Sequence, residues 1–222
     1  MLFRSSGAYR GIAGVYASPY GIYWLKVLGT RPDNRIIVQN LFDRGDEKID
    51  PVQVAIEPDL VYPAVAGRNI TRYGVKDFFY VLVTQDLDTR RGIDEDGMLT
   101  DYPLTYAYLS QFRDILVSRA AYKKYFHAEI GPQGRKRTVA TAPFYSIYNT
   151  SRLSVAPHRV TWKRMASRLD AVVLSQVLTP FGPKPMVSTD TTAFIPTDDA
   201  REAHYLCALL NSAVVGAFVR SF

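Results

Sequence analysis

Residues 159–195, RVTWKRMASRLDAVVLSQVLTPFGPKPMVSTDTTAFI, decide the fold class that the sequence predicts. The runs RVTWKRM, DAVVLSQVL and MVSTDTTAFI are rich in β-branched and aromatic residues, and polar or Pro/Gly-containing stretches separate them. Short runs of this composition, bounded by turn residues, are typical of β-strands. The segments at 138–149 and 152–156 have the same character, so the second half of the chain is predicted to be a succession of short strands.

Strands are also predicted in the first half. GIYWLKVL (21–28) and RIIVQNLF (35–42) are separated by GTRPDN, in which Pro, Asp and Asn favour a turn. We therefore expect a β-hairpin over residues 21–42. VQVAI (52–56) and FFYVLV (78–83) are predicted to add further strands.

Two stretches follow a helical period instead. Asp101 and Pro103 are typical of a helix start, and apolar residues then recur at helical spacing to about residue 126. A second helix is predicted from about 198 to 220, with acidic residues in its first turn. The expected fold is α+β and β-rich, with a mixed or antiparallel sheet platform and these two longer helices. We find no repeat and no linker that divides the chain, so a single domain over 1–222 is expected.

Composition limits the class of protein. The 222 residues are 47% hydrophobic and 22% charged, which is typical of globular domains and not of disordered or membrane chains. One cysteine cannot form a disulfide framework or a thiolate zinc site, and three histidines are too few for a convincing metal centre. No apolar stretch is long enough to span a membrane. We therefore expect no metal and no membrane contact, and a cytoplasmic location.

The basic charge is concentrated in one part of the chain. The net charge is +6, and residues 112–168 alone hold 12 Lys and Arg against two acids. Arginine presents a planar fork of donors that suits phosphates and guanine edges. This composition favours a polyanion such as double-stranded DNA as the partner.

Candidate DNA-binding residues lie where cations and aromatic side chains alternate in loops or at strand ends, since loop-borne cations can contact phosphates. The predicted set comprises Arg68, Arg72, Tyr73, Lys123, Lys124, Arg135, Lys136, Arg137, Arg159, Trp162, Lys163 and Arg164.

Catalytic motifs are incomplete. An amino-methylating enzyme needs a tight loop of a polar residue, two prolines and an aromatic residue, and neither SPY (18–20) nor APFY (142–145) supplies it. Nor does a glycine-rich cofactor loop follow a predicted strand. We expect no catalytic residues, no cofactor site and no activity of the chain alone. Two alternatives stay open, namely an enzyme fragment whose methylation or nuclease site is completed elsewhere in a parent protein, and a basic protein-interaction module.

A succession of blocks carries a resemblance to a known family. AYRGIAGVYASPYGIYWLKVL, EPDLVYPAVAGRNITRYG, DYPLTYAYLSQFRDILVSRAAYKKY, APFYSIYN, HRVTWKRM, STDTTAFIP and EAHYLCALLNSAVVGAFVRSF occur in this order. Together they resemble the C-terminal target-recognition region, or TaqI-like specificity domain, of bacterial adenine-N6 DNA methyltransferases and fused restriction-modification enzymes. The resemblance covers nearly the whole chain.

The resemblance implies a recognition module without its enzyme. In that family a separate catalytic domain binds S-adenosylmethionine, so the expected partners are duplex DNA and a methyltransferase domain in cis or in trans. Residues 67–70 resemble the family's GR-[DN]-I block, and residues 159–164 its K/R-V-x-W-K/R-R block. The chain is expected to be a fragment that ends within a longer region, which would leave an apolar patch exposed around Val214, Val215, Phe218, Val219 and Phe222.

Overall fold

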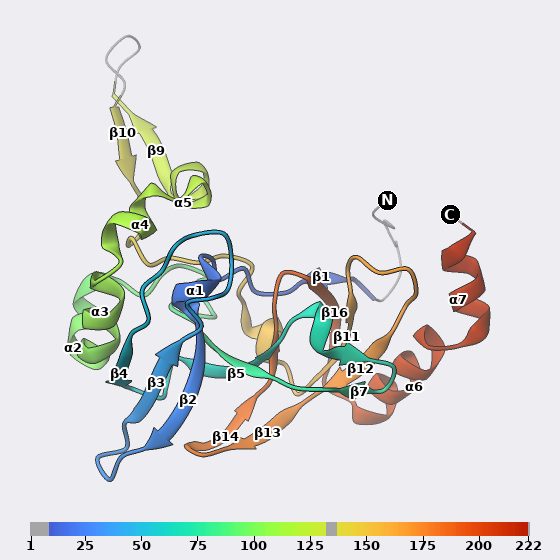
Figure 1. The fold of residues 1–222 in the computed structure, drawn as a ribbon. Helices are drawn as coiled ribbons and strands as arrows, with labels where there is room; N and C mark the ends of the chain where they lie inside the picture. Colours follow the sequence, from blue (N-terminus) through green and yellow to red (C-terminus); the bar gives the residue numbers. More distant parts are fainter. Residues whose placement is uncertain (1–8, 132–136, 222) are drawn as a thin grey trace. The chain divides into compact units, whose positions relative to one another are not determined.

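The computed structural model describes residues 9–131 and 137–221, which form two compact units. Unit 1 comprises residues 1–16, 62–79 and 152–222, and unit 2 comprises residues 17–61 and 80–151. Helices, antiparallel ladders and a parallel strand pair occur among the described residues (Figure 1), so the predicted α+β, β-rich class is confirmed. The expectation of a single domain stays a prediction, because both units are built from separated segments of the chain.

Unit 2 contains the predicted hairpin. Strand β2 (Trp24–Thr30) pairs antiparallel with β3 (Ile36–Asn40), and β3 pairs with β4 (Gln53–Ile56). β2 also pairs with β8 (Phe79–Leu82), all four residues of which are buried. Asn34 adopts a positive φ of 59° in the turn, a conformation that asparagine tolerates better than most residues.

The helix predicted over residues 102–126 forms as three shorter helices. These are α3 (Pro103–Ser110), α4 (Arg113–Ser118) and α5 (Ala120–Tyr125). The second break falls at Arg119, whose backbone is not helical (φ −52°, ψ 132°). The Arg119 guanidinium donates to the carbonyl oxygens of Ser18, Phe144 and Ser146. These contacts with distant parts of unit 2 accompany the break in the helix.

The remaining elements of unit 2 are short. They are α1 (Tyr20–Tyr23), α2 (Glu95–Asp101) and the hairpin of β9 (His127–Ile130) with β10 (Arg137–Ala140). Helix α2 begins at Glu95, at the end of a polar stretch. Asp94 caps it by accepting a hydrogen bond from the Gly97 N–H at 2.7 Å, a contact that satisfies an otherwise unpaired helix donor.

Three buried tyrosines tie the segments of unit 2 together. The Tyr23 hydroxyl donates to the Tyr145 carbonyl, Tyr108 to the Ile22 carbonyl, and Tyr145 to the Ile93 carbonyl, at 2.6–2.8 Å. Burial raises the pKa of Tyr23 to about 12, and it also raises the pKa values of Tyr108 and Tyr145. The folded state therefore keeps protons that the unfolded chain loses near pH 10.

We expect the free energy of unfolding to fall as pH rises above 10. Each tyrosine with a raised pKa contributes stability that is complete below pH 10 and is lost by up to about 1.4 kcal/mol per pH unit above it. Arg159 works in the opposite direction because burial lowers its pKa to about 10, but three tyrosines outweigh it. Urea titrations between pH 8 and 11 measure the fall, and Tyr108→Phe should make it shallower. A stability that stays constant to pH 11 would contradict the expectation.

Unit 1 is built on an antiparallel sheet in the order β1-β16-β11-β12. The strands are β1 (Ile12–Ala13), β16 (Thr192–Thr197), β11 (His158–Lys163) and β12 (Ala171–Leu174). Beside it, β5 (Val61–Val65) pairs in parallel with β15 (Val187–Ser188) through Ala64 and Val65. The predicted succession of short strands is confirmed over residues 159–195. It is wrong at 152–156, where the single-turn helix η2 (Arg152–Val155) forms, and within 138–149 only the start is strand.

Short elements complete unit 1. Strands β6 (Ile70–Thr71) and β7 (Gly74–Val75) form one hairpin, and β13 (Gln176–Thr179) and β14 (Gly182–Pro185) form another. The single-turn helices η1 (Gly67–Asn69) and η2 (Arg152–Val155) precede β6 and β11.

Two helices follow the sheet of unit 1 where one was predicted over 198–220. Helix α6 (Ala200–Leu210) packs Ala203, Leu206 and Cys207 against Val160 and Ala171 of the sheet. Helix α7 (Ala213–Arg220) begins after a bend of 56°. At the bend, Ser212 caps α7 by accepting from the Val215 N–H at 3.2 Å. In the described part of the chain no single helix is long and apolar enough to cross a membrane, although this bent pair has suitable length and composition.

Apolar side chains are exposed on the C-terminal helices. Val214 is 79% and Phe218 53% exposed, and Val219 is also exposed, as expected for these positions. Val215 is half-buried, and Phe222 lies outside the described residues. Tyr205 and Leu209 of α6 add to the exposed apolar surface. The expectation that the chain is a fragment stays a prediction.

Candidate nucleic-acid interface

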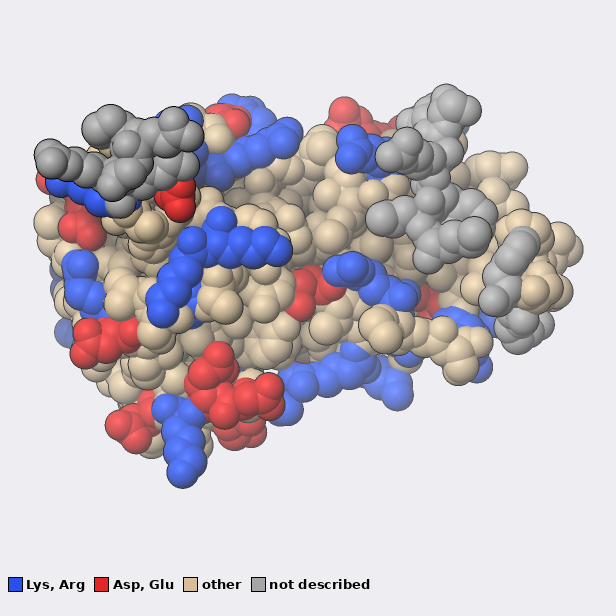
Figure 2. Space-filling view, turned by 90° about the horizontal axis from the view of Figure 1, so that it is seen from above, with Lys and Arg blue, Asp and Glu red and all other residues tan. Residues whose placement is uncertain are grey.

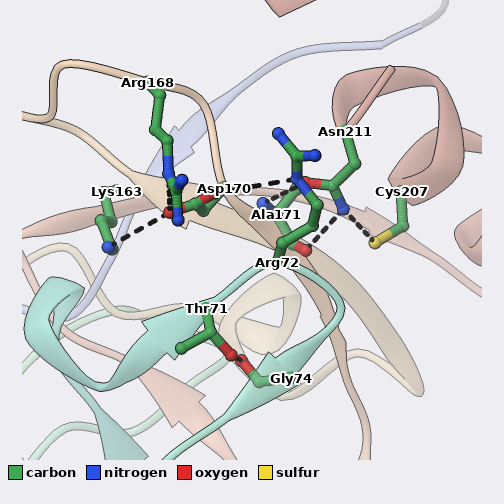
Figure 3. Close-up of polar contacts among 9 residues, drawn as sticks. All are labelled: Thr71, Arg72, Gly74, Lys163, Arg168, Asp170, Ala171, Cys207 and Asn211. Carbon is green, nitrogen blue, oxygen red and sulfur yellow. Dashed lines mark hydrogen bonds and ion pairs between the residues drawn. The ribbon is translucent and has the colours of Figure 1, made fainter. Parts of the chain in front are cut away.

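Three basic side chains surround one buried carboxylate in unit 1 (Figure 3). The Asp170 side chain is 3% exposed, and its Oδ2 lies 3.1 Å from Arg168 Nε and 3.4 Å from Lys163 Nζ. Arg72 Nε lies 4.0 Å from Oδ1 of the same carboxylate. We call Arg72, Lys163, Arg168 and Asp170 the Asp170 cluster. Arg72 comes from a distant segment of the chain, and the fold brings it to Lys163 and Arg168.

The β6–β7 hairpin places Arg72. Thr71 closes the hairpin by donating from Oγ1 to the Gly74 carbonyl at 2.9 Å. The tip residue Tyr73 is exposed and has a φ of 65°, a left-handed conformation that costs a residue other than glycine about 1–2 kcal/mol. Its N–H donates to the Ala171 carbonyl at 2.9 Å. This bond ties the hairpin tip to the residue after Asp170, and so holds Arg72 near the carboxylate.

The start of β12 is fixed by an asparagine from the helical segment. Asn211 Oδ1 accepts from the Ala171 N–H at 2.9 Å, and Asn211 Nδ2 donates to the Ala171 carbonyl at 2.8 Å (Figure 3). Asn211 Nδ2 also contacts Cys207 Sγ at 3.5 Å. A side chain that satisfies both backbone groups of one residue restrains its position strongly. Asp170, the preceding residue, is thereby held at the edge of the sheet.

Residues 67–70 lie close to the end of β11. A Cβ added to Gly67 would lie 3.7 Å from Lys163 Cγ and 3.1 Å from the Thr191 carbonyl oxygen. The Gly67 N–H donates to Thr191 Oγ1 at 2.8 Å. The absence of a side chain at Gly67 thus allows the 67–70 block to approach Lys163 at the end of β11.

Arg159, which the sequence predicts to contact DNA, lies in the interior of unit 1. It is fully buried, and its guanidinium donates to the backbone carbonyls of Ala156, Met186 and, at 3.5 Å, Ser175. Burial lowers its pKa to about 10. A side chain enclosed in this way cannot reach a phosphate or a base, so the prediction for Arg159 is wrong and its role is structural.

The other predicted residues of unit 1 occupy different surroundings. Arg68 lies on η1 and is exposed, and Arg164 is exposed and donates from one Nη to the Asp190 carbonyl at 3.0 Å. Trp162 is half-buried and packs against the cluster of Val160, Ala171 and α6, so its ring is mainly a core group. Arg68, Tyr73 and Arg164 therefore lie at the surface.

The predicted residues of unit 2 form a separate set. Lys123 and Lys124 are exposed on α5, and Lys124 Nζ lies 5.1 Å from the centre of the Tyr125 ring. Arg137 is exposed on β10. Arg135 and Lys136 lie outside the described residues.

Asp170 and Arg168 were missed by the sequence analysis. An isolated acid in a basic stretch directly before an apolar strand was the only signal, and spacing could not show its partners. Surface charge is no better guide: on the face shown in Figure 2, Lys and Arg side chains stand in several separate groups among acidic and uncharged residues. The buried carboxylate, and not the charge density, distinguishes the cluster.

Neither a metal site nor a comparison with known proteins assigns a function to the chain. Among residues 9–131 and 137–221, no three His, Cys, Asp or Glu side chains are placed to hold a metal ion. No protein-family model and no curated protein matches the chain.

Proposed function

We propose that the chain is a recognition module for double-stranded DNA that works with an adenine-N6 methyltransferase catalytic domain, in cis or in trans, in the bacterial cytoplasm. One observation supports this most strongly. Arg72 and Lys163, which reach the same carboxylate in unit 1, belong to two of the blocks that resemble target-recognition domains, residues 57–74 and residues 158–165. Exposed Arg68, Tyr73 and Arg164 belong to the same two segments.

The proposed role divides between contacts that position the duplex and contacts that read it. Lysine and arginine on loops suit phosphates, whose contacts fix the register of a protein on DNA but carry no sequence information. Exposed arginines such as Arg68 and Arg164 are of the residue type that suits the O6 and N7 atoms of guanine. S-adenosylmethionine and the reaction itself belong, in this proposal, to the catalytic domain.

Duplex binding is tested by fluorescence anisotropy across a salt series. We expect weak binding to arbitrary duplex DNA at physiological salt, with a Kd of about 10⁻⁴ to 10⁻⁶ M, and a linear fall of log affinity with log salt of about −0.9 per neutralised phosphate. Arg164→Ala should weaken binding, whereas Arg201→Ala, an exposed arginine on α6 outside the predicted set, should not. Absence of binding, or binding that ignores salt, would refute the proposal.

Calorimetry with S-adenosylmethionine separates the recognition module from the enzyme-fragment alternative. The proposal expects no heat of binding to the chain alone. Competition between duplex DNA and an acidic polypeptide separates it from the protein-interaction alternative, because a DNA module should prefer the duplex at equal charge concentration.

A further inference from the structure

We propose that Asp170 assembles Arg72, Lys163 and Arg168 into a binding site for a single phosphate group of the DNA backbone. This inference rests on the proposed function and names the ligand of one part of the surface. Asp170 acts in it as a positioning residue, since it is too buried to meet the duplex itself.

The charge balance of the cluster is the first argument. A buried carboxylate must be paired, but one or two well-placed cations suffice to compensate it. Here three cations surround one carboxylate, which leaves two positive charges in excess. Lys163 Nζ and Arg168 Nε even share the same oxygen, so two like charges are held close together. A second anion beside the cations would relieve this repulsion.

The geometry of the arginines is the second argument. Arg72 and Arg168 both approach Asp170 through Nε. The terminal Nη groups form the other edge of each guanidinium and can bind a phosphate. Within the described residues these Nη groups have no other hydrogen-bond or ion-pair partner. Asp170 Oδ2 thus accepts a hydrogen bond from Arg168 Nε, while Oδ1 forms only an ion pair with Arg72 at 4.0 Å, and the NH₂ groups of both arginines are left for a ligand.

Exposure is the third argument. The side chains of Arg168 and Arg72 are 63% and 51% exposed, and that of Lys163 is 26% exposed, above a carboxylate that is 3% exposed. Long cationic side chains usually lose considerable rotamer freedom when they bind a ligand. A buried anion that already restrains these side chains reduces the entropy that they lose when the ligand binds. Lys163 and Arg168 are therefore partly ordered for a phosphate in advance.

The test uses Asp170→Asn, because the change in net charge would raise DNA affinity whereas the loss of positioning would lower it. Asp170→Asn removes a negative charge, and simple attraction would then tighten DNA binding. If Asp170 positions the cations, the same change should instead weaken duplex affinity about tenfold, as expected for the loss of one charge-assisted contact, and should make the salt slope shallower by about one. Asp198→Asn makes the same charge change at an exposed acid and should bind as tightly as the wild type or slightly more tightly.

The affinities are to be compared at a temperature where circular dichroism shows every variant to be folded. Folded Asp170→Asn that binds as tightly as Asp198→Asn would overturn the proposal. If Asp170→Asn does not fold, Arg168→Gln replaces it, since Arg168 is largely exposed. Arg168→Gln should lower affinity and salt slope together, and unchanged values would overturn the inference.

A small probe separates failure of this inference from failure of the proposed function. Inorganic tripolyphosphate presents phosphate groups without sugars or bases, and it should bind the wild type more tightly than Arg168→Gln. If duplex DNA does not bind but tripolyphosphate does so in this way, the proposed function fails and the phosphate site stands. If DNA binds and Arg168→Gln affects neither ligand, the function stands and the site fails. Hexaglutamate is the control ligand. If it binds the wild type as tightly as tripolyphosphate does, and Arg168→Gln weakens both to the same extent, the assignment of phosphate as the ligand is overturned.

Discussion

Replacing Arg159 with alanine is expected to lower the free energy of unfolding by about 4 kcal/mol. The substitution removes the donors of the Met186 and Ala156 carbonyls, and each buried polar group left unpaired costs about 1–3 kcal/mol. It also leaves a cavity, because the Arg159 side chain is the largest that is fully buried. Urea denaturation followed by the fluorescence of Trp162, which lies on the same strand, measures the loss.

Two comparison variants isolate the cause. Arg159→Met keeps most of the packing but not the donors, and should lose less stability than Arg159→Ala. Arg164→Ala removes an exposed arginine from the segment following β11 and should cost no more than about 1 kcal/mol, while it weakens DNA binding. Equal stability of Arg159→Ala and Arg164→Ala would show that the buried hydrogen bonds of Arg159 contribute nothing.

Gly14→Ala is expected to destabilise unit 1 by about 3 kcal/mol, at the upper end of what overpacking usually costs. A Cβ at Gly14 would lie 2.1 Å from the Thr189 carbonyl oxygen and 2.6 Å from that of Ser188. Both are backbone atoms that hydrogen bonds hold in place, including the bond from the Val15 N–H to the Ser188 carbonyl at 2.8 Å. Relief of the clash would therefore require the backbone of one segment to move.

Gly11→Ala is the matched control, because it changes the same residue type three positions earlier. A Cβ there would meet only the edge of the Trp162 ring at 3.4 Å, an ordinary contact. Its melting temperature should stay near that of the wild type, whereas that of Gly14→Ala should fall by several degrees. Similar melting temperatures for the two variants would mean that the backbone near Gly14 adapts without cost.

Local sequence signals explain the parts of the fold that could be predicted. The hairpin over 21–42 follows from its turn residues and β-branched runs, which act over a few positions. The breaks at Arg119 and at Asn211–Ser212 could not be predicted in this way, because Arg119 and Asn211 bond to residues up to 101 positions away. Helical periodicity continues through both points, and only the tertiary partners show where the helix stops.

The candidate site was predictable only in part, for a similar reason. Basic residues in aromatic surroundings identified Arg72 and Lys163, but the same pattern selected Arg159, which is buried. Burial does not alternate along β11, since Arg159, Val160 and Thr161 are all buried. Strand periodicity therefore could not predict that Arg159 is buried. Asp170 pairs with Arg72, which lies nearly a hundred residues earlier in the chain. No local sequence pattern could predict this ion pair.

The interleaving of the two units has a consequence for synthesis on the ribosome. Chain segments pass from one unit to the other after residues 16, 61, 79 and 151. Unit 2 has all its residues once Ser151 has left the exit tunnel, whereas unit 1 holds its early segments at 1–16 and 62–79 without their partners until 152–222 follow. Since ribosomes add roughly 5–20 residues per second, those early strands wait several seconds before the sheet of unit 1 can close. Truncations after Ser151 should therefore yield nascent chains in which protease resistance is confined to unit 2.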